Sequence, residues 1–413
     1  MSQVNWMMQD MNSFFASAEQ FLRPELRNRA IGIVPLESDA TSIIAASYEA
    51  KRCGVRTGTK VYEAKRLCPH IQLIRARPNV YVEIHHELLK SVDQCVEVHH
   101  VYSIDEWTIQ LCGRYRQVDQ AVQLAGAIKR QLRRDFGPWL TSSIGIAPSR
   151  LLAKTASNLK KPDGLTVLTP EDLPGRISHL SLEDLPGIGQ GMAARLKQAG
   201  IVTIEDLWKL DHRQALQIWG SVSGARWWNG LHGIDDPEPP THRHSMSHGR
   251  VLDPRHRNEA GAHCILVLLL CKLGRRLRQT GYFARGLQLT LSGNRDTIFH
   301  QKIDLPCVQD TLSLLHQFER LWVRRPRNLR DLKKVDVTVS KLEQRSEVSG
   351  YLFDEISQSQ RLSHALDEIS DRWGPGSIYF ANTHAYRDAL EDKIAFGRIP
   401  ELASRRSTFQ SGT

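Results

Sequence analysis

Two acidic clusters that lie far apart in the sequence carry the side chains best suited to chemistry. The first contains Asp10, and the second contains the adjacent pair Asp105 and Glu106. Each lies in or just after a short, largely apolar stretch of the kind that forms a buried strand. Three carboxylates on adjacent strands repel one another unless cations neutralise them, and their hard oxygen ligands suit Mg²⁺. Because two metal ions about 3.5–4 Å apart commonly serve phosphoryl or nucleotidyl transfer, the clusters predict such an active site if they meet in the fold.

The positive charge of the chain is concentrated in one region. The 413 residues have a net charge of +10. Residues 241–345 contain 20 Lys and Arg against 9 Asp and Glu, a net of +11, so the remainder of the chain nets −1. This uneven distribution predicts a dedicated module that binds a polyanion such as nucleic acid. A chain of this length also exceeds one compact core, so we expect several domains.

The cysteines and the apolar segments favour a cytoplasmic protein. The seven cysteines include no Cys-x-x-Cys pair, which predicts neither a zinc site nor a disulfide framework and fits a reducing compartment. No basic segment followed by an apolar stretch marks a signal peptide at the N-terminus. The apolar run Cys264–Cys271 is too short to span a bilayer. We therefore expect it to form a buried helix face, and we expect no membrane partner.

The elements that must position the acids alternate between strand and helix. We expect strands in the first three of the following ranges and helices in the last three: 1–10, 100–112, 140–147, 78–97, 116–135 and 149–160. Interleaved strands and helices predict a mixed α/β domain. A small, basic insertion at 11–77 interrupts this domain.

The middle of the chain is mostly helical in pattern. Gly187 and Gly189 precede an amphipathic stretch within residues 169–233. Glycine allows close backbone approach, and free N–H groups before a helix bind phosphate. The pattern resembles a helix-hairpin-helix, and a plain helical turn is the other interpretation. The proline-rich segment Asp236–Pro240 then predicts a stiff, extended linker.

A second α/β pattern follows the linker. Strand, helix, two strands, helix and strand follow one another to about residue 343, and Gly286–Leu291 alternates leucines on one face as a strand does. The remaining residues form a tail with one helix expected at 361–373. Three arginines, Arg275, Arg276 and Arg278, occupy a helical stretch that we interpret as a solvated face.

Five motifs in order resemble the Y family of translesion DNA polymerases, of the DinB and UmuC types. They are Asp10–Ser17, Ser47–Lys51, Ser103–Glu106, Lys161–Gly164 and the Pro-Gly-Ile-Gly element at 186–189. The resemblance covers roughly residues 5–343. It implies an α/β multidomain, right-handed polymerase with the following parts: a mixed α/β palm (1–10 and 78–168), small fingers (11–77), a helical thumb (169–233), a linker (234–245), a little finger of βαββαβ type (246–343) and a tail (344–413).

The resemblance implies that the acidic clusters bind two Mg²⁺ ions. Asp10, Asp105 and Glu106 match the family's metal-binding carboxylates, and the carbonyl of Met11 matches its backbone ligand. By this interpretation Asp10 and Asp105 bridge the ions, and Glu106 serves the ion that activates the primer 3′-hydroxyl. Helix caps or solvated charges are the other interpretation of these acids. Trp107 replaces the usual small residue after the acid pair, so we expect a crowded metal site.

The resemblance also implies a site for the incoming deoxynucleotide. Phe15 occupies the position of the family's steric gate, a ring packed under the deoxyribose that excludes a 2′-hydroxyl, and Phe14 lies beside it. The other interpretation is that both rings are ordinary core aromatics. Tyr48, Lys51 and Lys161 match positions that hold the triphosphate.

Two substitutions relative to the commoner family pattern fit the UmuC-type branch. Lys51 stands where Arg is more frequent, and Asn12 stands where Asp is common. Lysine offers a point charge without the bidentate fork of arginine. A solvated surface lysine is therefore the other interpretation of Lys51.

In the little finger the resemblance implies contacts with template phosphates. One strand contributes Ser247, Gly249 and Arg250, and another element contributes Lys333 and Lys334. Such contacts give affinity without sequence readout. The histidine pair His85 and His86, like His99 and His100, lacks a convincing metal-ligand spacing, so we interpret all four as solvated.

The sequence thus predicts a template-directed, error-tolerant translesion DNA polymerase that acts in the repair of damaged DNA. Its partners are primer–template DNA and deoxynucleoside triphosphates, and we expect a monomer. Leu352 and Phe353 in the tail suggest a peptide that inserts into the sliding clamp, or alternatively residues that pack onto the little finger. Two other functions stay open: a catalytically weak, polymerase-like DNA-binding scaffold and a palm-domain nucleotide cyclase.

Overall fold

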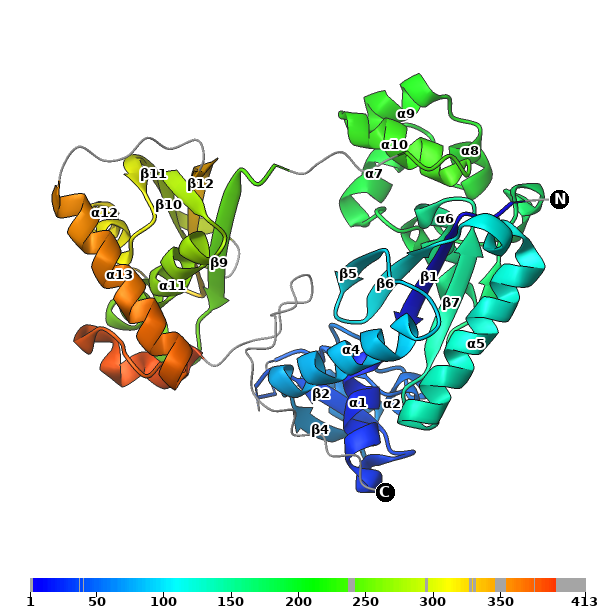
Figure 1. Cartoon of the computed structure of the whole chain (residues 1–413), viewed down its shortest axis with the longest axis horizontal. Coiled ribbons are helices and arrows are strands. Elements are labelled where there is room, and N and C mark those ends of the chain that lie inside the picture. The colour runs from blue at the N-terminus through cyan, green and yellow to red at the C-terminus, as the bar shows by residue number, and fades with distance from the viewer. Residues whose placement is uncertain are drawn as a thin grey trace. The chain divides into compact units, whose positions relative to one another are not determined.

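The computed structural model of the chain contains two compact units, one before and one after the segment 237–241 (Figure 1). It describes residues 3–390, apart from 37, 40, 237–241, 294–295, 327–328, 330–331, 346–353 and 375. Leu352, Phe353 and the middle of the expected linker therefore lie outside the described residues. Within the described part of the chain, every helix is too short or too polar to cross a membrane.

Helices and strands alternate along most of the chain. The helices are α1 (Phe14–Leu22), α2 (Tyr48–Arg52), α3 (Val61–Leu67), α4 (Pro78–Asp93), α5 (Val118–Phe136), α6 (Arg150–Leu159), α7 (Gln190–Gln198), α8 (Ile204–Trp208), α9 (His212–Trp219), α10 (Val222–Leu231), α11 (Glu259–Gln279), α12 (Thr311–Trp322) and α13 (Asp354–Trp373). The strands are β1 (Trp6–Met11), β2 (Ile31–Val34), β3 (Ala45–Ala46), β4 (Gln72–Arg75), β5 (His100–Ser103), β6 (Glu106–Gln110), β7 (Ser142–Ala147), β8 (Leu165–Val167), β9 (Ser245–Val251), β10 (Tyr282–Ser292), β11 (Thr297–Val308) and β12 (Lys334–Gln344).

The palm is a sheet of order β5-β6-β1-β7-β8 with β1 at its centre. All of β1 is buried, and it pairs antiparallel with both β6 and β7. The expectation of one strand at 100–112 is wrong, because β5 and β6 form a hairpin whose turn contains Asp105. The Ser103 hydroxyl closes this turn: it donates to Asp105 Oδ1 at 2.6 Å and lies 3.4 Å from the Asp105 amide nitrogen.

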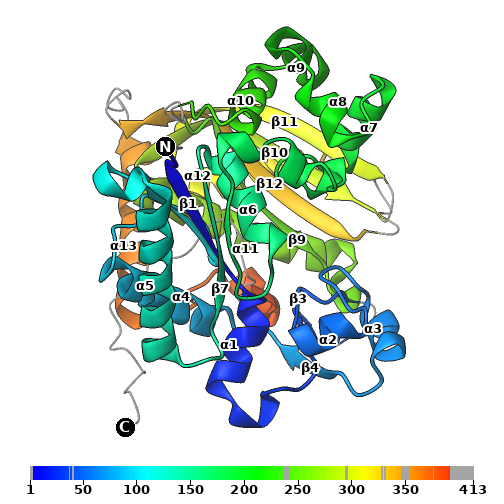
Figure 2. The same cartoon turned by 90° about the vertical axis from the view of Figure 1, so that its right-hand side faces the viewer.

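Helices cover both faces of the palm sheet, with α5 and α6 on opposite sides of β1 and β7 (Figure 2). On one face, β1 residues such as Met7 pack with Trp107 and residues of α4 and α5. On the other face, Trp6 and Met8 pack with Leu152 and Ala153 of α6 and with the thumb helices. Strand alternation therefore sends successive β1 side chains into two different cores.

The fingers are a small three-stranded sheet of order β3-β2-β4 that carries α2 and α3. Ser47 begins α2, because its hydroxyl accepts a hydrogen bond from the Ala50 amide and fulfils the N-cap preference for serine. The same hydroxyl accepts from the Ile31 amide at 3.1 Å. This buried serine thus fixes the start of α2 against β2.

The little finger contains strand, helix, two strands, helix and strand in the expected order, with a sheet of order β11-β10-β12-β9. The run at 264–271 lies inside α11, and its buried residues include Leu266, Leu269 and Leu270, as predicted for a buried helix face. The solvated face expected for the α11 arginines is wrong. Arg278 has a side chain only 4% exposed and forms two hydrogen bonds with the Asp367 carboxylate, and Arg275 pairs with Asp371. Helix α13, which carries both aspartates, covers these arginines.

We predict that Gly145→Ala loosens the packing of α6 on the palm. A Cβ at Gly145 would lie 2.0 Å from the Ala153 carbonyl oxygen and 2.3 Å from the Ser157 amide, which are backbone atoms that cannot yield. Overpacking of this kind lowers the free energy of unfolding by about 1–3 kcal/mol or more. The matched control is Gly126→Ala inside α5, where only the flexible Arg130 side chain approaches.

The control should stabilise the protein by about 0.5–1 kcal/mol, since alanine favours a helix interior over glycine. Urea unfolding of both variants, followed by tryptophan fluorescence, gives the two midpoints. Equal shifts of the urea midpoint in the two variants would show that the close contact between β7 and α6 at Gly145 does not limit stability.

Candidate active site

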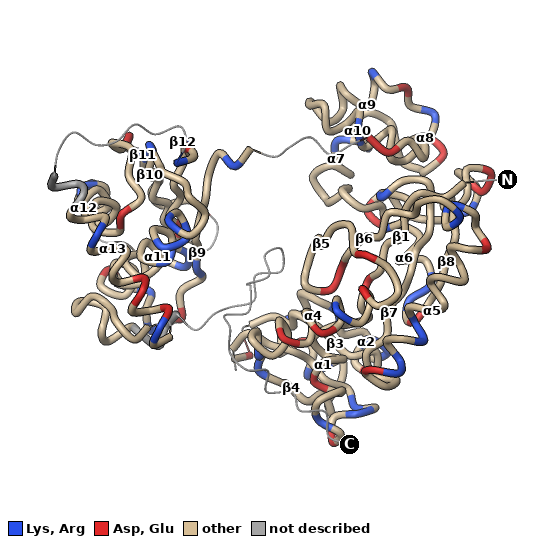
Figure 3. The backbone as a smooth tube through the Cα atoms, in the orientation of Figure 1, with Lys and Arg blue, Asp and Glu red and all other residues tan. Residues whose placement is uncertain are grey.

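The structure brings the two acidic clusters together. Asp10 and Glu106 are directly paired in the antiparallel register of β1 and β6, so their side chains project from the same face of the sheet. Asp105 lies in the adjoining turn, and its carbonyl accepts a hydrogen bond of 2.9 Å from the Met11 amide. Figure 3 shows acidic segments of the backbone, in red, near the labels β5, β6 and β1. Three carboxylates and the Met11 carbonyl are thus located at one end of the central strands.

Two lysines neutralise part of this negative charge. The Lys154 ammonium donates to Asp10 Oδ2 and, at 2.6 Å, to Glu106 Oε1. Lys161 lies 2.7 Å from Asp10 Oδ1. Burial lowers the pKa of Lys154, but the charges of Asp10 and Glu106 outweigh it and raise the pKa above its ordinary value. Lys154 therefore holds the two carboxylates together as a cation.

Asp105 has no ion pair of this kind among the described contacts. Burial, followed by the neighbouring charges of Asp10 and Glu106, raises its pKa to about 6, against the opposing effect of the Ser103 hydrogen bond. A carboxylate whose ionised form is disfavoured by its surroundings gains most from a cation placed beside it. The oxygen-only set of carboxylates and carbonyl fits a hard divalent cation.

Trp107 does not crowd the carboxylates, contrary to expectation. It pairs with Gln9 in the β1–β6 register, and the two side chains meet on the opposite face, where Trp107 Nε1 donates to Gln9 Oε1 at 3.1 Å. Trp107 is fully buried. The alternation of a strand separates it from its neighbour Glu106, so a bulky residue at this position packs into the core below the site.

His85 on α4 is also buried, which overturns its assignment as a solvated residue. Its Nδ1 lies 2.7 Å from the Ile104 carbonyl and donates to it, since a carbonyl can only accept. Burial lowers the pKa of His85 to about 4. A neutral imidazole thus anchors the backbone of the turn that carries Asp105.

Helix α2 directs its polar residues at the turn that follows β1. The Lys51 ammonium donates to the Ser13 hydroxyl at 2.7 Å, and the Tyr48 hydroxyl lies 3.4 Å from Asn12 Oδ1. Lys51 also lies over the Tyr48 ring, 4.5 Å from its centroid. Lys51 is nevertheless exposed, so the interpretation as a solvated surface lysine stays open beside the triphosphate contact.

The charges around this turn favour an anion. Partial enclosure and the charge of Lys161 lower the pKa of Lys51, although Asp10 opposes the shift. Burial raises the pKa of Tyr48 to about 12, so it remains a hydroxyl donor. Two lysines and a phenol thus converge near Asp10, a set suited to the oxygens of a polyphosphate.

The loop that carries Lys161 is held by a cation from α5. Lys129 donates to the carbonyls of Ser142 and Asp163, at 2.9 and 2.7 Å, and pairs with the Asp163 carboxylate at 2.7 Å. Its side chain is 21% exposed. This contact fixes the path of the chain two residues after Lys161.

Phe15 is buried and stacks on Tyr81 of α4, with ring centroids 4.7 Å apart and an interplanar angle of 19°. The Tyr81 hydroxyl donates to Glu19 at 2.8 Å, and Arg77 makes two hydrogen bonds with the same carboxylate. Glu19 has no exposed surface. Phe14 is buried as well. A buried ionic network therefore supports the ring on which Phe15 rests.

The thumb glycines form the turn before α7. Gly187 has a φ of 88°, a left-handed conformation that side chains disfavour. Its neighbour Pro186 accepts a hydrogen bond from Trp227 Nε1 at 2.8 Å. Gly189 is the N-cap of α7, and a Cβ there would meet nothing within 4 Å. The turn is thus open to a ligand at Gly189.

The predicted phosphate contacts of the little finger divide between two faces. Ser247 and Gly249 lie on the exposed face of the sheet, and Lys334 of the neighbouring strand β12 lies on the same face. The Lys334 ammonium lies 2.9 Å from a carboxylate oxygen of Asp336. Arg250 pairs in register with the buried Val335, so its Cβ belongs to the other face. A Cβ at Gly249 would lie 1.7 Å from Asp336 Oδ1, which explains a glycine there. Lys333 precedes β12, and its carbonyl accepts from the Leu252 amide.

Sequence reasoning missed the residues that support the site rather than form it. These are Ser103, His85, Lys129, Lys154, Tyr81, Glu19 and Arg77. For Lys154 a signal exists: it interrupts the small apolar residues of α6 that pack on the sheet. A lone cation on a buried helix face needs a partner. For Glu19 and Tyr81, which are far apart in sequence, no local pattern predicts the contact.

We predict that Tyr81→Phe destabilises the protein but leaves the Phe15 stack in place. The change removes the hydrogen bond to the buried Glu19 carboxylate while it keeps the ring. A hydrogen bond to a charged group contributes about 1.5–3 kcal/mol to the free energy of unfolding. Urea unfolding measures this loss, with Tyr62→Phe on the exposed surface of α3 as the control. A Tyr81→Phe variant as stable as this control would show that Arg77 and Arg23 satisfy Glu19 without the Tyr81 hydroxyl.

Comparisons with known proteins agree with this geometry. A family model described as the impB/mucB/samB family matches residues 9–158, and its C-terminal domain matches residues 243–352. A model of the DNA polymerase-iota thumb domain matches residues 183–235. A solved Y-family DNA polymerase chimera shares the fold, with a TM-score of 0.69 and 19% identity over 82% of this chain and 99% of that chain.

Several curated relatives are called DNA polymerase IV. That of Moorella thermoacetica is 33% identical over 90% of this chain and 94% of its own length. The protein of Pelotomaculum thermopropionicum is 30% identical over 90% of this chain and 93% of its own length. That of Vibrio cholerae is 32% identical over 58% of this chain and 66% of its own length. The fold class expected from the sequence is thereby confirmed, and the chain belongs to the Y family of DNA polymerases, of the DinB type.

Proposed function

We propose that this chain is a translesion DNA polymerase that extends a primer by metal-assisted nucleotidyl transfer at Asp10, Asp105 and Glu106. Membership of the Y family supports a DNA-directed DNA polymerase that acts on primer–template DNA and deoxynucleoside triphosphates. The observation that carries the mechanism is the register of β1 and β6, which pairs Asp10 with Glu106 beside Asp105. Three carboxylates at one end of the central strands repel one another unless cations neutralise them.

The oxygen-only donor set suits hard divalent cations, and we propose that it holds two Mg²⁺ ions. Asp10 and Asp105 would bridge the ions, with the Met11 carbonyl as a further ligand and Glu106 on the side of the primer terminus. When bound, such ions polarise the reacting phosphate and lower the pKa of the attacking hydroxyl. His85 and Ser103 keep the Asp105 turn in place. Lys154 pairs with both Asp10 and Glu106 and so holds these two carboxylates side by side.

The triphosphate would lie over the turn that follows β1. Lys51, Tyr48 and Lys161 surround this turn, and the mutual repulsion of the two lysines is relieved when an anion binds between them. Negative charge that builds up on the leaving pyrophosphate is stabilised by the same donors. Lys129 contributes indirectly, because it fixes the loop that carries Lys161.

Phe15 would act as the steric gate against ribonucleotides. It follows the Asp10 strand directly on α1, and its stack on Tyr81 prevents the ring from moving away. The Glu19–Arg77 network holds Tyr81 in turn. A ring supported in this way excludes a 2′-hydroxyl by a clash that it cannot relieve.

DNA binding would use the thumb turn and the exposed face of the little finger. The open N-cap at Gly189, next to Gly187, suits a phosphate of the DNA. The net charge of +11 in residues 241–345 supports backbone contacts by Ser247, Gly249, Lys333 and Lys334. Arg250 would reach the DNA around the edge of the sheet, since β9 is the outer strand.

Three further proposals concern the setting of the enzyme. We keep the sliding clamp as a partner of Leu352 and Phe353, residues outside the described part of the chain. A monomer in the cytoplasm remains the expected state. The alternative of a weak scaffold loses its one supporting feature, because Trp107 faces away from the carboxylates. Membership of the Y family also removes the reason to consider a nucleotide cyclase.

We predict that Asp105→Ala abolishes primer extension and leaves DNA binding intact. The carboxylate acts on the transition state, whereas the DNA contacts lie elsewhere, so the rate should fall by about 10²–10³-fold or more. Primer extension with Mg²⁺ and all four deoxynucleotides measures the rate, and fluorescence anisotropy measures binding. Asp119→Ala, an exposed carboxylate on α5, is the control and should behave as the wild type. Extension by Asp105→Ala at the wild-type rate would refute this assignment.

We predict that Phe15→Ala admits ribonucleotides. Loss of the clash should reduce the preference for deoxynucleotides by about 10²-fold, because the clash acts only against the 2′-hydroxyl. Single-nucleotide insertion with matched ribo- and deoxynucleotides gives the ratio of kcat/KM values. Phe14→Leu, a change of the neighbouring buried ring, should leave the ratio unaltered. An unaltered ratio in both variants means that Phe15 is a core residue only.

A further inference from the structure

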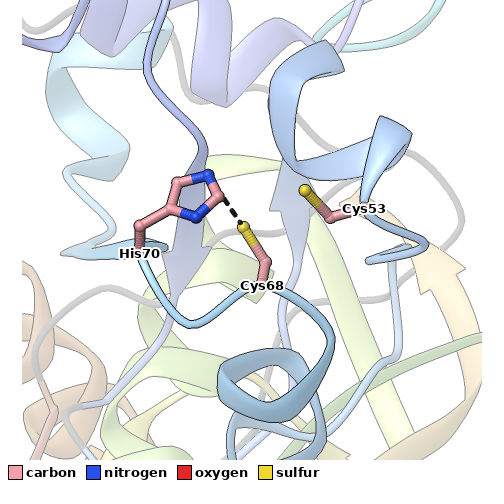
Figure 4. A group of neighbouring side chains, drawn as sticks. All are labelled: Cys53, Cys68 and His70. Carbon is pink, nitrogen blue, oxygen red and sulfur yellow. Dashed lines mark hydrogen bonds between the residues drawn. The ribbon is translucent and has the colours of Figure 1, made fainter.

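Three side chains that could ligate a metal meet in the fingers, away from the carboxylate site. Cys53, Cys68 and His70 each present one ligand atom, and these atoms all lie within 4.8 Å of one another. Figure 4 shows the three side chains converging from the ends of two helices and the turn that follows the second. Within the described residues, this is the one group of three such side chains that satisfies the distance.

The spacing of these atoms matches a zinc coordination shell. Cys68 Sγ and His70 Nε2 are 3.6 Å apart. Zinc binds sulfur at about 2.3 Å and nitrogen at about 2.0–2.1 Å, so a tetrahedral site places such a pair about 3.5–3.6 Å apart. Two thiolates and one imidazole are soft or borderline ligands, which select zinc and disfavour Mg²⁺. Three protein ligands leave a fourth position for water.

The fold around the cluster gives each ligand a defined position. Cys53 is the C-cap of α2, and Cys68 is the C-cap of α3. Cys68 is fully buried in the core of the fingers with residues such as Ala50 and Val61, whereas His70 is exposed. The open side of the cluster, at His70, therefore faces solvent, and an ion can enter without unfolding the fingers.

We propose that Cys53, Cys68 and His70 bind one zinc ion that joins the ends of α2 and α3. Binding displaces the two thiol protons to solvent and uses the unprotonated Nε2 of the imidazole. Lys51 lies two residues before Cys53 on α2. The ion thus fixes the end of the helix that directs Tyr48 and Lys51 at the active site.

The test is the zinc content of untagged, full-length protein, purified under reducing conditions with zinc present and then dialysed. Atomic emission should give one zinc per chain. Cys53→Ser and His70→Asn should remove it, and His70→Asn keeps the core intact because the residue is exposed. Two controls should retain the ion: Cys112→Ser, an exposed thiol elsewhere, and Asp105→Ala, which excludes adventitious zinc at the carboxylates.

Competition with a chromophoric chelator then measures affinity. Loss of a neighbour that only orients a ligand costs about 10–100-fold in metal affinity, so loss of a direct ligand should cost about 100-fold or more. Cobalt substitution should give a thiolate-to-metal charge-transfer band in the wild type and in the two controls. The band should be absent from Cys53→Ser and His70→Asn. Zinc-free wild type, or equal zinc in His70→Asn, would overturn the proposal. In protein purified without reductant and with no zinc bound, a proteolytic fragment in which Cys53 is joined to Cys68 would instead identify a disulfide here and overturn the proposal.

Discussion

The mutual repulsion of three carboxylates at the end of the central strand is the constraint on which the rest of the palm depends. The register of β1 and β6 forces Asp10 and Glu106 onto one face, and the hairpin turn adds Asp105. Lys154 neutralises part of this charge, and it reaches the site because α6 packs closely on β7 over Gly145. Gly145 of β7 thus allows Lys154 to reach the carboxylates of β1 and β6. The contact between Trp107 and Gln9 lies on the opposite face of the sheet, so these core side chains take no space beside the carboxylates.

The fingers present the complementary charge to the same point. Lys51 and Lys161 converge on the turn after β1, where Lys161 pairs with Asp10 and Lys51 donates to the Ser13 hydroxyl. The negative charge of the sheet and the positive charge of the loops therefore meet at this turn. The short helix α2 positions Tyr48 and Lys51 with only about one and a half turns of backbone. Its placement therefore depends on the buried N-cap Ser47 and on the cysteines near its C-terminal end.

The sequence predicted the fold class and the meeting of the acids, because strand patterns and ordered motifs are local signals. The expectation of a crowded site overlooked that side chains alternate along a strand, which places Trp107 and its neighbour Glu106 on opposite faces. The Arg278–Asp367 pair and the network of Glu19, Arg77 and Tyr81 join residues far apart in the chain. Exposed-looking charges such as Arg278 become buried only when another helix covers them. His85 likewise looks solvated until Ile104 offers its carbonyl.

The central claim is that Asp10, Asp105 and Glu106 form one site for two catalytic cations. Electron paramagnetic resonance of Mn²⁺, titrated into the complex with an unextendable primer–template and the correct deoxynucleotide, counts these ions directly. The account predicts two bound ions per chain in the complete complex and the loss of both tight sites in Asp10→Asn, since this carboxylate is the proposed ligand of both ions. A count of one in the wild type, or an unchanged count of two in Asp10→Asn, would contradict it.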